Sequence, residues 1–168
     1  MKSIFKLLFA AFLTVAPLTA YAQSNVAHIN VQQLISEMPE VIAAQNELAK
    51  LEKDYTTQID NAFKEFQTKA QSYSSDAANQ TDVTNQARQK ELESMQTNLQ
   101  EFRDSAAQEL QKKQMDLMTP LLEKARNAIT KVGEEQGFNY VIDSSPNGGI
   151  ILANGKDLLA DVKKELGF

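Results

Sequence analysis

The strongest constraint on the fold is a segment of 80 residues, from Glu40 to Thr119, that contains neither glycine nor proline. Apolar or small side chains recur along its first half at steps of three and four, the spacing of one helix face. That face comprises Val41, Ala44, Leu48, Leu51, Tyr55, Ile59, Ala62, Phe66, Ala70 and Tyr73. A helix from Glu40 to Tyr73 is therefore expected, with Pro39 suited to its first turn.

A second long helix is expected after a polar stretch. Residues 74–81 read SSDAANQT, a turn-prone composition, and Thr81 or Asp82 can cap the following helix. Its apolar face comprises Leu92, Met95, Leu99, Phe102, Ala106, Leu110, Gln114, Leu117, Leu121, Ala125, Ile129 and Val132. At ~1.5 Å per residue, the segments 40–73 and 82–119 are roughly 50 and 57 Å long. Two helices of such similar length predict an antiparallel hairpin.

Pro120 stands at the expected root of this hairpin. A proline within a helix removes one hydrogen bond and clashes with the carbonyl four residues earlier, here that of Asp116. We therefore expect a kink between Asp116 and Pro120, with Pro120 as a hinge. The helix should continue to about Gln136 and stop at Gly137.

Short strands are expected at both ends of the chain. Residues 26–31 alternate in polarity, which predicts a strand with Ala27, Ile29 and Val31 on one face. Residues 138–143 and 149–153 are predicted to form a β-hairpin around a turn at 144–148. Asp157 should cap a closing helix that ends at Leu166.

These elements predict an α+β fold with an inserted arm. Residues 23–38 and 120–168 would form a small body, the association domain. Residues 39–119 would form the helical-hairpin arm, with its tip loop near 74–81. A body this small usually needs a disulfide, a metal or oligomerisation to be stable. Oligomerisation is the remaining route here, so the body is expected to be an assembly interface. The residues expected at that interface are Ala27, Ile29, Val31, Tyr140, Ile142 and Ile151.

Residues 1–22 have the three parts of a secretory signal peptide. Lys2 and Lys6 precede an apolar run at 7–15, and an A-x-A pattern ends at Ala22. The apolar run is too short to span a bilayer. Export with cleavage after Ala22 is expected, and the absence of any cysteine beyond it excludes a lipoprotein-type anchor.

The expected mature chain is acidic. The signal segment holds two of the 17 Lys and Arg and none of the 22 Asp and Glu, which leaves 15 basic against 22 acidic residues and a net charge of −7. A negative chain is a poor general binder of nucleic acid or anionic membranes. The absence of cysteine excludes disulfides and thiolate zinc sites.

The sequence offers no convincing active site, so no enzyme, metal or cofactor is expected. His28 is the one histidine in the chain, and on the predicted strand it points away from the face of Ile29. A structural or interface role is therefore expected for it. Residues 143–145 are interpreted as a strand end and turn, rather than as a catalytic trio. No glycine-rich loop leads from a strand into a helix, so nucleotide binding has no support.

Four apolar side chains fall beside the helix seam rather than on it: Ile42, Phe63, Met115 and Met118. Exposed apolar groups on long helices usually mark a partner surface, and the flexible Met side chain suits promiscuous contacts. These four residues are therefore the candidate surface for a binding partner. The alternative is that they pack against the body or a neighbouring subunit, because a wide apolar stripe is also normal for core-facing helices.

The ends of the chain resemble one known family. The segment 26–31 followed by Leu34 and Ile35, the segment 137–143 of the pattern G-[YF]-x-[YF]-V-[IL]-D, and the closing segment 157–166 are similar to the Skp family. This family, also called OmpH-like, comprises periplasmic chaperones of gram-negative bacteria. The arm matches in length and pattern only.

The resemblance implies a homotrimer in the periplasm, whose three helical tentacles surround a cavity. It implies an ATP-independent holdase that keeps unfolded outer-membrane proteins in that cavity. The candidate partner surface of Ile42, Phe63, Met115 and Met118 would then be the client-binding surface. One departure is that well-known members are strongly basic with positive tips, whereas this chain is acidic and its tip, residues 74–82, lacks Lys and Arg. No lipid or lipopolysaccharide site is therefore carried over. The alternative function is a structural spacer that bridges envelope partners.

Overall fold

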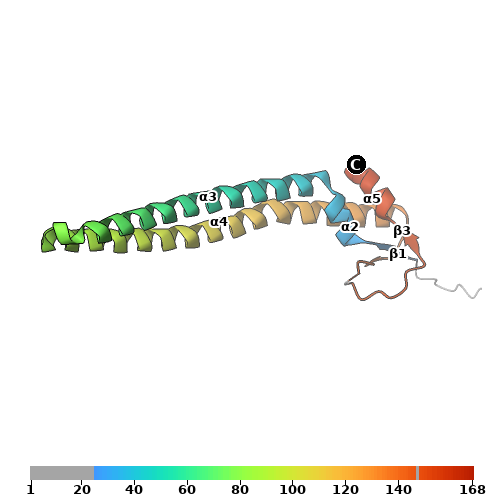
Figure 1. The fold of residues 1–168 in the computed structure, drawn as a ribbon. Coiled ribbons are helices and arrows are strands. Elements are labelled where there is room, and N and C mark those ends of the chain that lie inside the picture. Colours follow the sequence, from blue (N-terminus) through green and yellow to red (C-terminus); the bar gives the residue numbers. More distant parts are fainter. Residues whose placement is uncertain (1–24, 147) are drawn as a thin grey trace, which may run out of the picture.

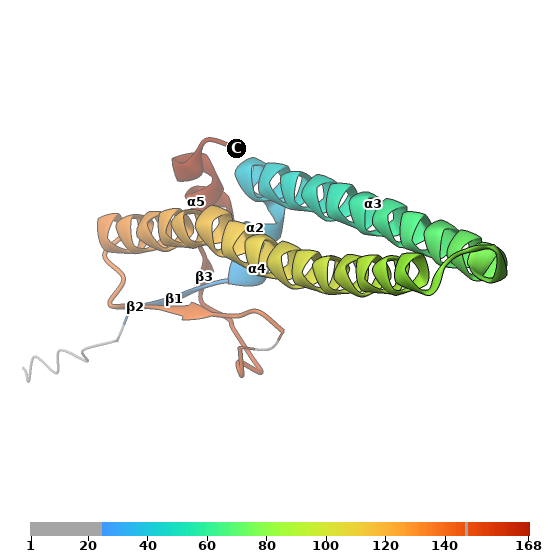
Figure 2. The same cartoon turned by 90° about the vertical axis from the view of Figure 1, so that its left-hand side faces the viewer.

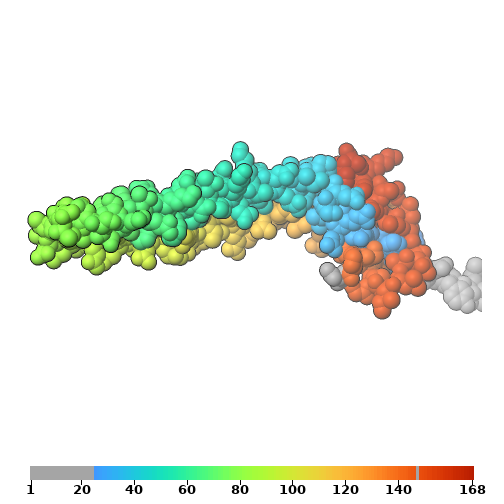
Figure 3. Space-filling model, viewed as in Figure 1, coloured from blue at the N-terminus to red at the C-terminus, as the bar shows by residue number. Residues whose placement is uncertain are grey.

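The computed structural model describes residues 25–146 and 148–168. The predicted signal peptide and its cleavage site lie outside these residues. A long two-helix arm projects from a small body that holds both described ends of the chain (Figure 1). In the space-filling view, the arm is a narrow rod and the body is broader (Figure 3). The predicted α+β class is confirmed.

The arm consists of α3 (Pro39–Asp76) and α4 (Asp82–Glu135), joined by the short 3-10 turn η2 (Ala77–Asn79). Pro39 occupies the first turn of α3, as predicted. Thr81 caps α4, since its hydroxyl accepts a hydrogen bond from the Thr84 amide at 3.2 Å. The two helices lie side by side over the length of α3 (Figures 1 and 2), so the antiparallel hairpin is confirmed.

Pro120 lies inside α4, which continues as one helix through it. α4 therefore belongs to both parts of the molecule, with its first part in the arm and its last turns in the body. The bend near the root is gentle (Figure 2). The helix ends as predicted, because Gly137 has a φ of +74° that a glycine adopts without strain.

The sheet has the order β2-β1-β3, with β1 (Val26–Ile29) in the centre. Both β2 (Tyr140–Asp143) and β3 (Lys156–Asp157) pair with β1 in parallel. The predicted β-hairpin of residues 138–143 and 149–153 is therefore wrong. Residues 149–153 form no strand, and the third strand is a two-residue segment that follows them.

The core lies where the arm meets the sheet. It is built from one face of β1, the first turn of α3, the body part of α4, and the two short helices α2 (Val31–Glu37) and α5 (Leu159–Leu166). Ten buried residues form it: Ala27, Ile29, Leu34, Met38, Val41, Ala125, Ala128, Val132, Leu158 and Val162. The N-terminal strand thus joins the C-terminal segment around the root of the arm.

Candidate interaction surface

The arm has a single seam of contact between its helices. Leu99 and Ala106 are buried there, and the ring of Tyr55 meets that of Phe102 edge-on at 6.0 Å between centroids. Most of the predicted face is at least half-buried, but Ala62 and Gln114 are exposed. One seam between two helices leaves most of each helix surface in contact with solvent.

Ion pairs cross the hairpin along one flank of this seam. They are Glu40–Lys124 at 2.6 Å, Glu47–Lys113 at 2.7 Å, Lys69–Glu91 at 2.6 Å and Asp76–Arg88 at 3.1 Å. On α3 their members follow one another at spacings of 7, 22 and 7 residues, which keeps them within ~40° around the helix. We call this side the ion-paired flank. A hollow of about 480 Å³ on it is lined mainly by charged side chains.

The opposite flank carries apolar and amide side chains. Phe63 is 40% exposed and stacks on Phe66 at 6.5 Å between ring centroids. A hollow of about 470 Å³ beside these rings is also lined by Gln96 and Gln100 of α4, together with two charged residues, Glu101 and Arg103. Phe63 lies ~160° around α3 from Glu47 of the ion-paired flank. We call this side the amide flank, and it comprises Ile42, Phe63, Gln96, Gln100 and Met118.

The four predicted client-binding residues differ in accessibility. Ile42 and Phe63 are exposed on the amide flank, and Met115 is 54% exposed on α4. Met118 is only partly exposed, because it packs against the body core. Met118 thus fits the alternative of packing against the body, whereas the single chain leaves Ile42, Phe63 and Met115 exposed, and their client-binding role stays a prediction.

The arm tip is held by a polar network that the sequence patterns did not predict. Asp76 accepts hydrogen bonds from Asn79 at 3.2 Å, Gln80 at 2.7 Å and Arg88 at 3.1 Å. These side-chain hydrogen bonds, that of Asn79 foremost, hold the pKa of Asp76 below its usual range. Arg88 also lies 4.7 Å above the ring of Tyr73, a cation–π contact on a guanidinium whose Nη1 has no hydrogen-bond partner among the described residues.

Glu91 extends this network toward the root. It accepts hydrogen bonds from Lys69 and from the Tyr73 hydroxyl, both at 2.6 Å. These bonds, that of Lys69 foremost, lower the pKa of Glu91. Together the side chains form the tip network: Lys69, Tyr73, Asp76, Asn79, Gln80, Arg88 and Glu91. The sequence signal for this network was the presence of aromatic and charged residues on both sides of the turn, Tyr73 and Asp76 before it and Arg88 and Glu91 after it.

The predicted interface residues lie in two environments. Ala27 and Ile29 are each only 1% exposed, because the root of the arm covers their face of the sheet. Their side chains are thus buried within one chain, and Val31 also packs against the core, so the interface role of these three residues stays a prediction. Tyr140 and Ile142 are exposed, and Ile151 is fully exposed in the loop that follows β2.

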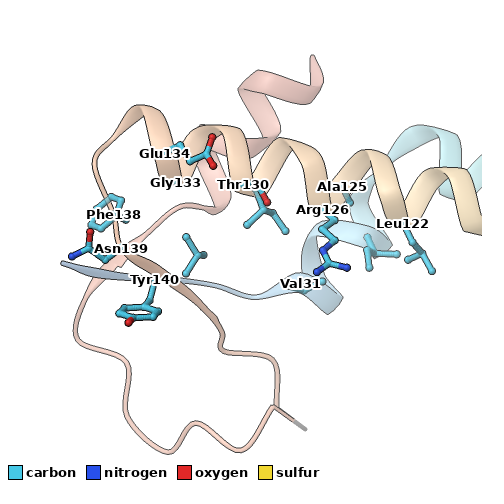
Figure 4. A pocket seen from close by; sticks show the side chains of 13 residues that line it. Val31, Leu122, Ala125, Arg126, Thr130, Gly133, Glu134, Phe138, Asn139 and Tyr140 are labelled. Carbon is cyan, nitrogen blue, oxygen red and sulfur yellow. The ribbon is translucent and has the colours of Figure 1, made fainter. Parts of the chain in front are cut away.

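Strand register explains this division. Val26 and His28 of β1 are paired with Tyr140 and Ile142 of β2. Neighbouring residues of a strand point to opposite faces, so these four share the face away from α4. The ring of Tyr140 points away from that helix (Figure 4). The outer face of the sheet is therefore apolar and incompletely covered.

A groove of about 530 Å³ runs between the body part of α4 and the first two strands (Figure 4). Leu122 of α4 lines it and is 44% exposed. Val31 and Ile35 line it from the side of α2. Leu122 is four residues after Met118, so this groove continues the amide flank into the body.

The polar groups of the body serve its folding. Asp143 accepts hydrogen bonds from Ser145 and from the Val31 amide, which ties β2 to α2. Burial acts to raise the pKa of Asp143, but these hydrogen bonds outweigh it, so the pKa is lowered. His28 lies 3.2 Å from the Ser144 hydroxyl on the outer face. Within the described part of the chain, no three His, Cys, Asp or Glu side chains are grouped to hold a metal.

A family model for outer membrane protein, OmpH-like, matches residues 25–166. The chain belongs to the OmpH-like family. It is 25% identical over 159 residues to the chaperone protein Skp of Yersinia enterocolitica, covering 92% of this chain and 93% of that protein. It is 20% identical over 151 residues to the chaperone protein Skp of Pectobacterium atrosepticum, with 90% of each covered.

The OmpH-like fold is also seen in a solved structure. A crystal structure of an OmpH-like protein from Caulobacter crescentus CB15 matches with a TM-score of 0.77 at 12% identity, covering 86% of this chain and 85% of the other. The family resemblance predicted from the two ends of the sequence is thus confirmed. No helix in the described residues of this OmpH-like chain is both long and apolar enough to span a membrane.

Proposed function

We propose that this OmpH-like protein is a periplasmic chaperone that binds unfolded outer-membrane proteins in a cavity between arms and prevents their aggregation without ATP. Its family and the name of its Skp relatives support the chaperone class. The observation that carries the proposal is the exposure of Ile42, Phe63 and Met115 along a hairpin with only one seam. Scattered apolar contacts of this kind are individually weak and suit a client that has no fixed structure.

The active form in this proposal is a homotrimer assembled through the body, residues 23–38 and 120–168. Tyr140, Ile142 and Ile151 supply the exposed apolar surface for that contact. Assembly would cover the outer sheet face and would stabilise a body whose own core is small. Three arms, residues 39–119, would then surround a common cavity in which contacts are repeated by symmetry, so that avidity replaces tight binding.

Pro120 is proposed as the hinge of each arm. It lies where α4 leaves the body, and its ring nitrogen cannot donate to the Asp116 carbonyl. A helix that lacks this bond bends more easily, which would let the cavity adapt to clients of different size. Pro120→Ala should stiffen the root and narrow the range of client sizes that are held.

The acidic charge restricts the partners of this protein. A net charge of −7 on the expected mature chain disfavours anionic lipid, lipopolysaccharide and nucleic acid. The tip of this arm offers no cationic side chain at residues 74–82 to recruit them. Client capture in this proposal therefore depends on apolar contact rather than on attraction by positive charge.

The experiment is a light-scattering assay of aggregation. A urea-denatured outer-membrane β-barrel protein is diluted into buffer with and without the mature chain, in the absence of nucleotide. We expect the chain to suppress scattering, and ATP to have no effect. Unchanged scattering would reject the holdase. A spacer would instead capture one folded envelope protein in a pull-down and show no preference for unfolded chains.

A further inference from the structure

We infer that the client lies along the amide flank of the arm and along the body groove that continues it, whereas the ion-paired flank makes no client contact. This inference rests on the proposed holdase function and assigns it to one side of the hairpin. The occupant is one extended segment of an unfolded outer-membrane protein, with the length of one of its β-strands.

The two flanks differ in how their polar groups are already satisfied. Every ion pair that joins α3 to α4 in the described chain lies on the ion-paired flank. On the other side, Met118 lies ~140° around α4 from Lys113, just as Phe63 lies ~160° around α3 from Glu47. The hollow of the ion-paired flank is lined by seven charged residues, against two, Glu101 and Arg103, in the hollow of the amide flank. A client that covered the ion-paired flank would therefore desolvate more charge, which is unfavourable.

The amide flank fits the chemistry of an unfolded β-strand. Such a strand has unpaired backbone N–H and C=O groups, and its side chains alternate between apolar and polar. The amide of Gln96 can donate and accept hydrogen bonds, so it can satisfy either backbone group, whereas Gln100 offers its amide oxygen as an acceptor because its Nε2 donates to Asp104 at 3.0 Å. Phe63 and its stacking partner Phe66 provide apolar contact in the same hollow.

The dimensions of the flank also fit one strand. Ile42 and Phe63 are 21 residues apart on α3, which corresponds to roughly 32 Å at ~1.5 Å per residue. An extended chain covers this distance with about ten residues at ~3.3 Å each. A membrane-spanning β-strand has about 9–11 residues. The stretch from mid-arm to root therefore accommodates one such strand.

The flank has a continuous path into the body. Met118 and Leu122 lie one turn apart on the same face of α4, and Leu122 lines the groove together with Val31 and Ile35. A client longer than one strand can thus extend from the arm toward the base of the cavity. The groove at the body end of this path is lined mainly by apolar side chains, so it can also contact the apolar side chains of the client.

Site-specific photocrosslinking tests the assignment. A photoreactive phenylalanine analogue is placed at Gln96 on the amide flank or, as a matched control, at Asp54 in the hollow of the ion-paired flank. Both positions are exposed on an arm helix, and neither side chain has a hydrogen-bond partner among the residues that the structure describes. With an unfolded outer-membrane protein bound to the full mature chain, we expect a crosslinked product at least about fivefold stronger from position 96.

Binding of the variants Phe63→Ser and Asp54→Ser provides the second measurement. Loss of the exposed ring should raise the half-saturating concentration for client about tenfold, whereas Asp54→Ser should leave it unchanged. Circular dichroism confirms that both variants fold. Equal or stronger crosslinking at position 54, with client still held, overturns the flank assignment alone. A wild-type chain that holds no client overturns the proposed function and this inference with it.

Discussion

Gly133 offers a direct test of how closely α4 packs on the sheet. A Cβ added at this buried glycine would lie 2.8 Å from Cγ2 of Val141, closer than real Cβ atoms approach such neighbours. Alanine favours the helix by about 1 kcal/mol over glycine. Overpacking a core costs about 1–3 kcal/mol. The clash should therefore outweigh the gain, and Gly133→Ala should lower the free energy of unfolding by up to about 2 kcal/mol.

A double-mutant cycle isolates the contact. Val141→Ala removes the methyl group that the new Cβ would meet, so in that background Gly133→Ala should keep its helix gain and stabilise by up to about 1 kcal/mol. Guanidinium unfolding followed by circular dichroism, at one protein concentration, measures all four proteins. An equal effect of Gly133→Ala in both backgrounds would show that β2 does not lie against α4 as described.

Three further predictions concern the core, the interface and the tip. Leu158→Ala, at a fully buried position, should lower the free energy of unfolding by about 2–5 kcal/mol, whereas Val83→Ala at the exposed tip should change it by less than about 0.5 kcal/mol; denaturant titration compares them. Ile151→Asp should leave the circular dichroism unchanged but dissociate the proposed trimer in multi-angle light scattering, and a persistent trimer would exclude Ile151 from the proposed interface. Hydrogen bonds lower the pKa values of Asp76 and Glu91, so these carboxylates should contribute their full stability above the ordinary carboxyl range near about pH 4. That contribution should be lost as the pH falls through the lowered pKa values. Thermal unfolding of the wild type and of Asp76→Asn across this pH range measures the loss, and a loss already complete at about pH 6 would contradict the prediction.

The arm was predictable because its signals are local. Apolar spacing of three and four residues defines a helix face without knowledge of the partner helix. Pro39 marks the first turn of α3 because its nitrogen carries no hydrogen to donate, as predicted. Thr81, one of the two predicted caps, marks the start of α4 through its hydroxyl. The similar lengths of the predicted segments 40–73 and 82–119 then left one compact topology for the arm, the antiparallel hairpin.

The body was harder to predict because its pairing is nonlocal. Residues 149–153 have the composition of a strand, yet β1 is the central strand and pairs on one side with β2 and on the other with β3. No local signal specifies two parallel pairings across such a long insertion. The alternation around Ala27 and Ile29 correctly identified a buried face, but it could not distinguish cover by the chain's own helices from cover by a second subunit.

The exposed apolar side chains of the arm were only partly predictable, because periodicity is local and the contacts between elements are not. Periodicity located Ile42, Phe63 and Met115 off the seam, and they are exposed. It did not separate Met118, whose environment depends on the contact between arm and body. The division into two flanks depends on which charges meet across the hairpin, and that requires the register of α3 against α4.

Native mass spectrometry of the mature chain mixed with a urea-denatured outer-membrane protein, without nucleotide, shows whether a trimer of this chain holds the client. We expect a complex of three copies of this chain with one unfolded client, and a trimer when the client is omitted. A monomeric chain with no bound client would contradict this expectation, because neither a shared cavity nor avidity between arms would then exist.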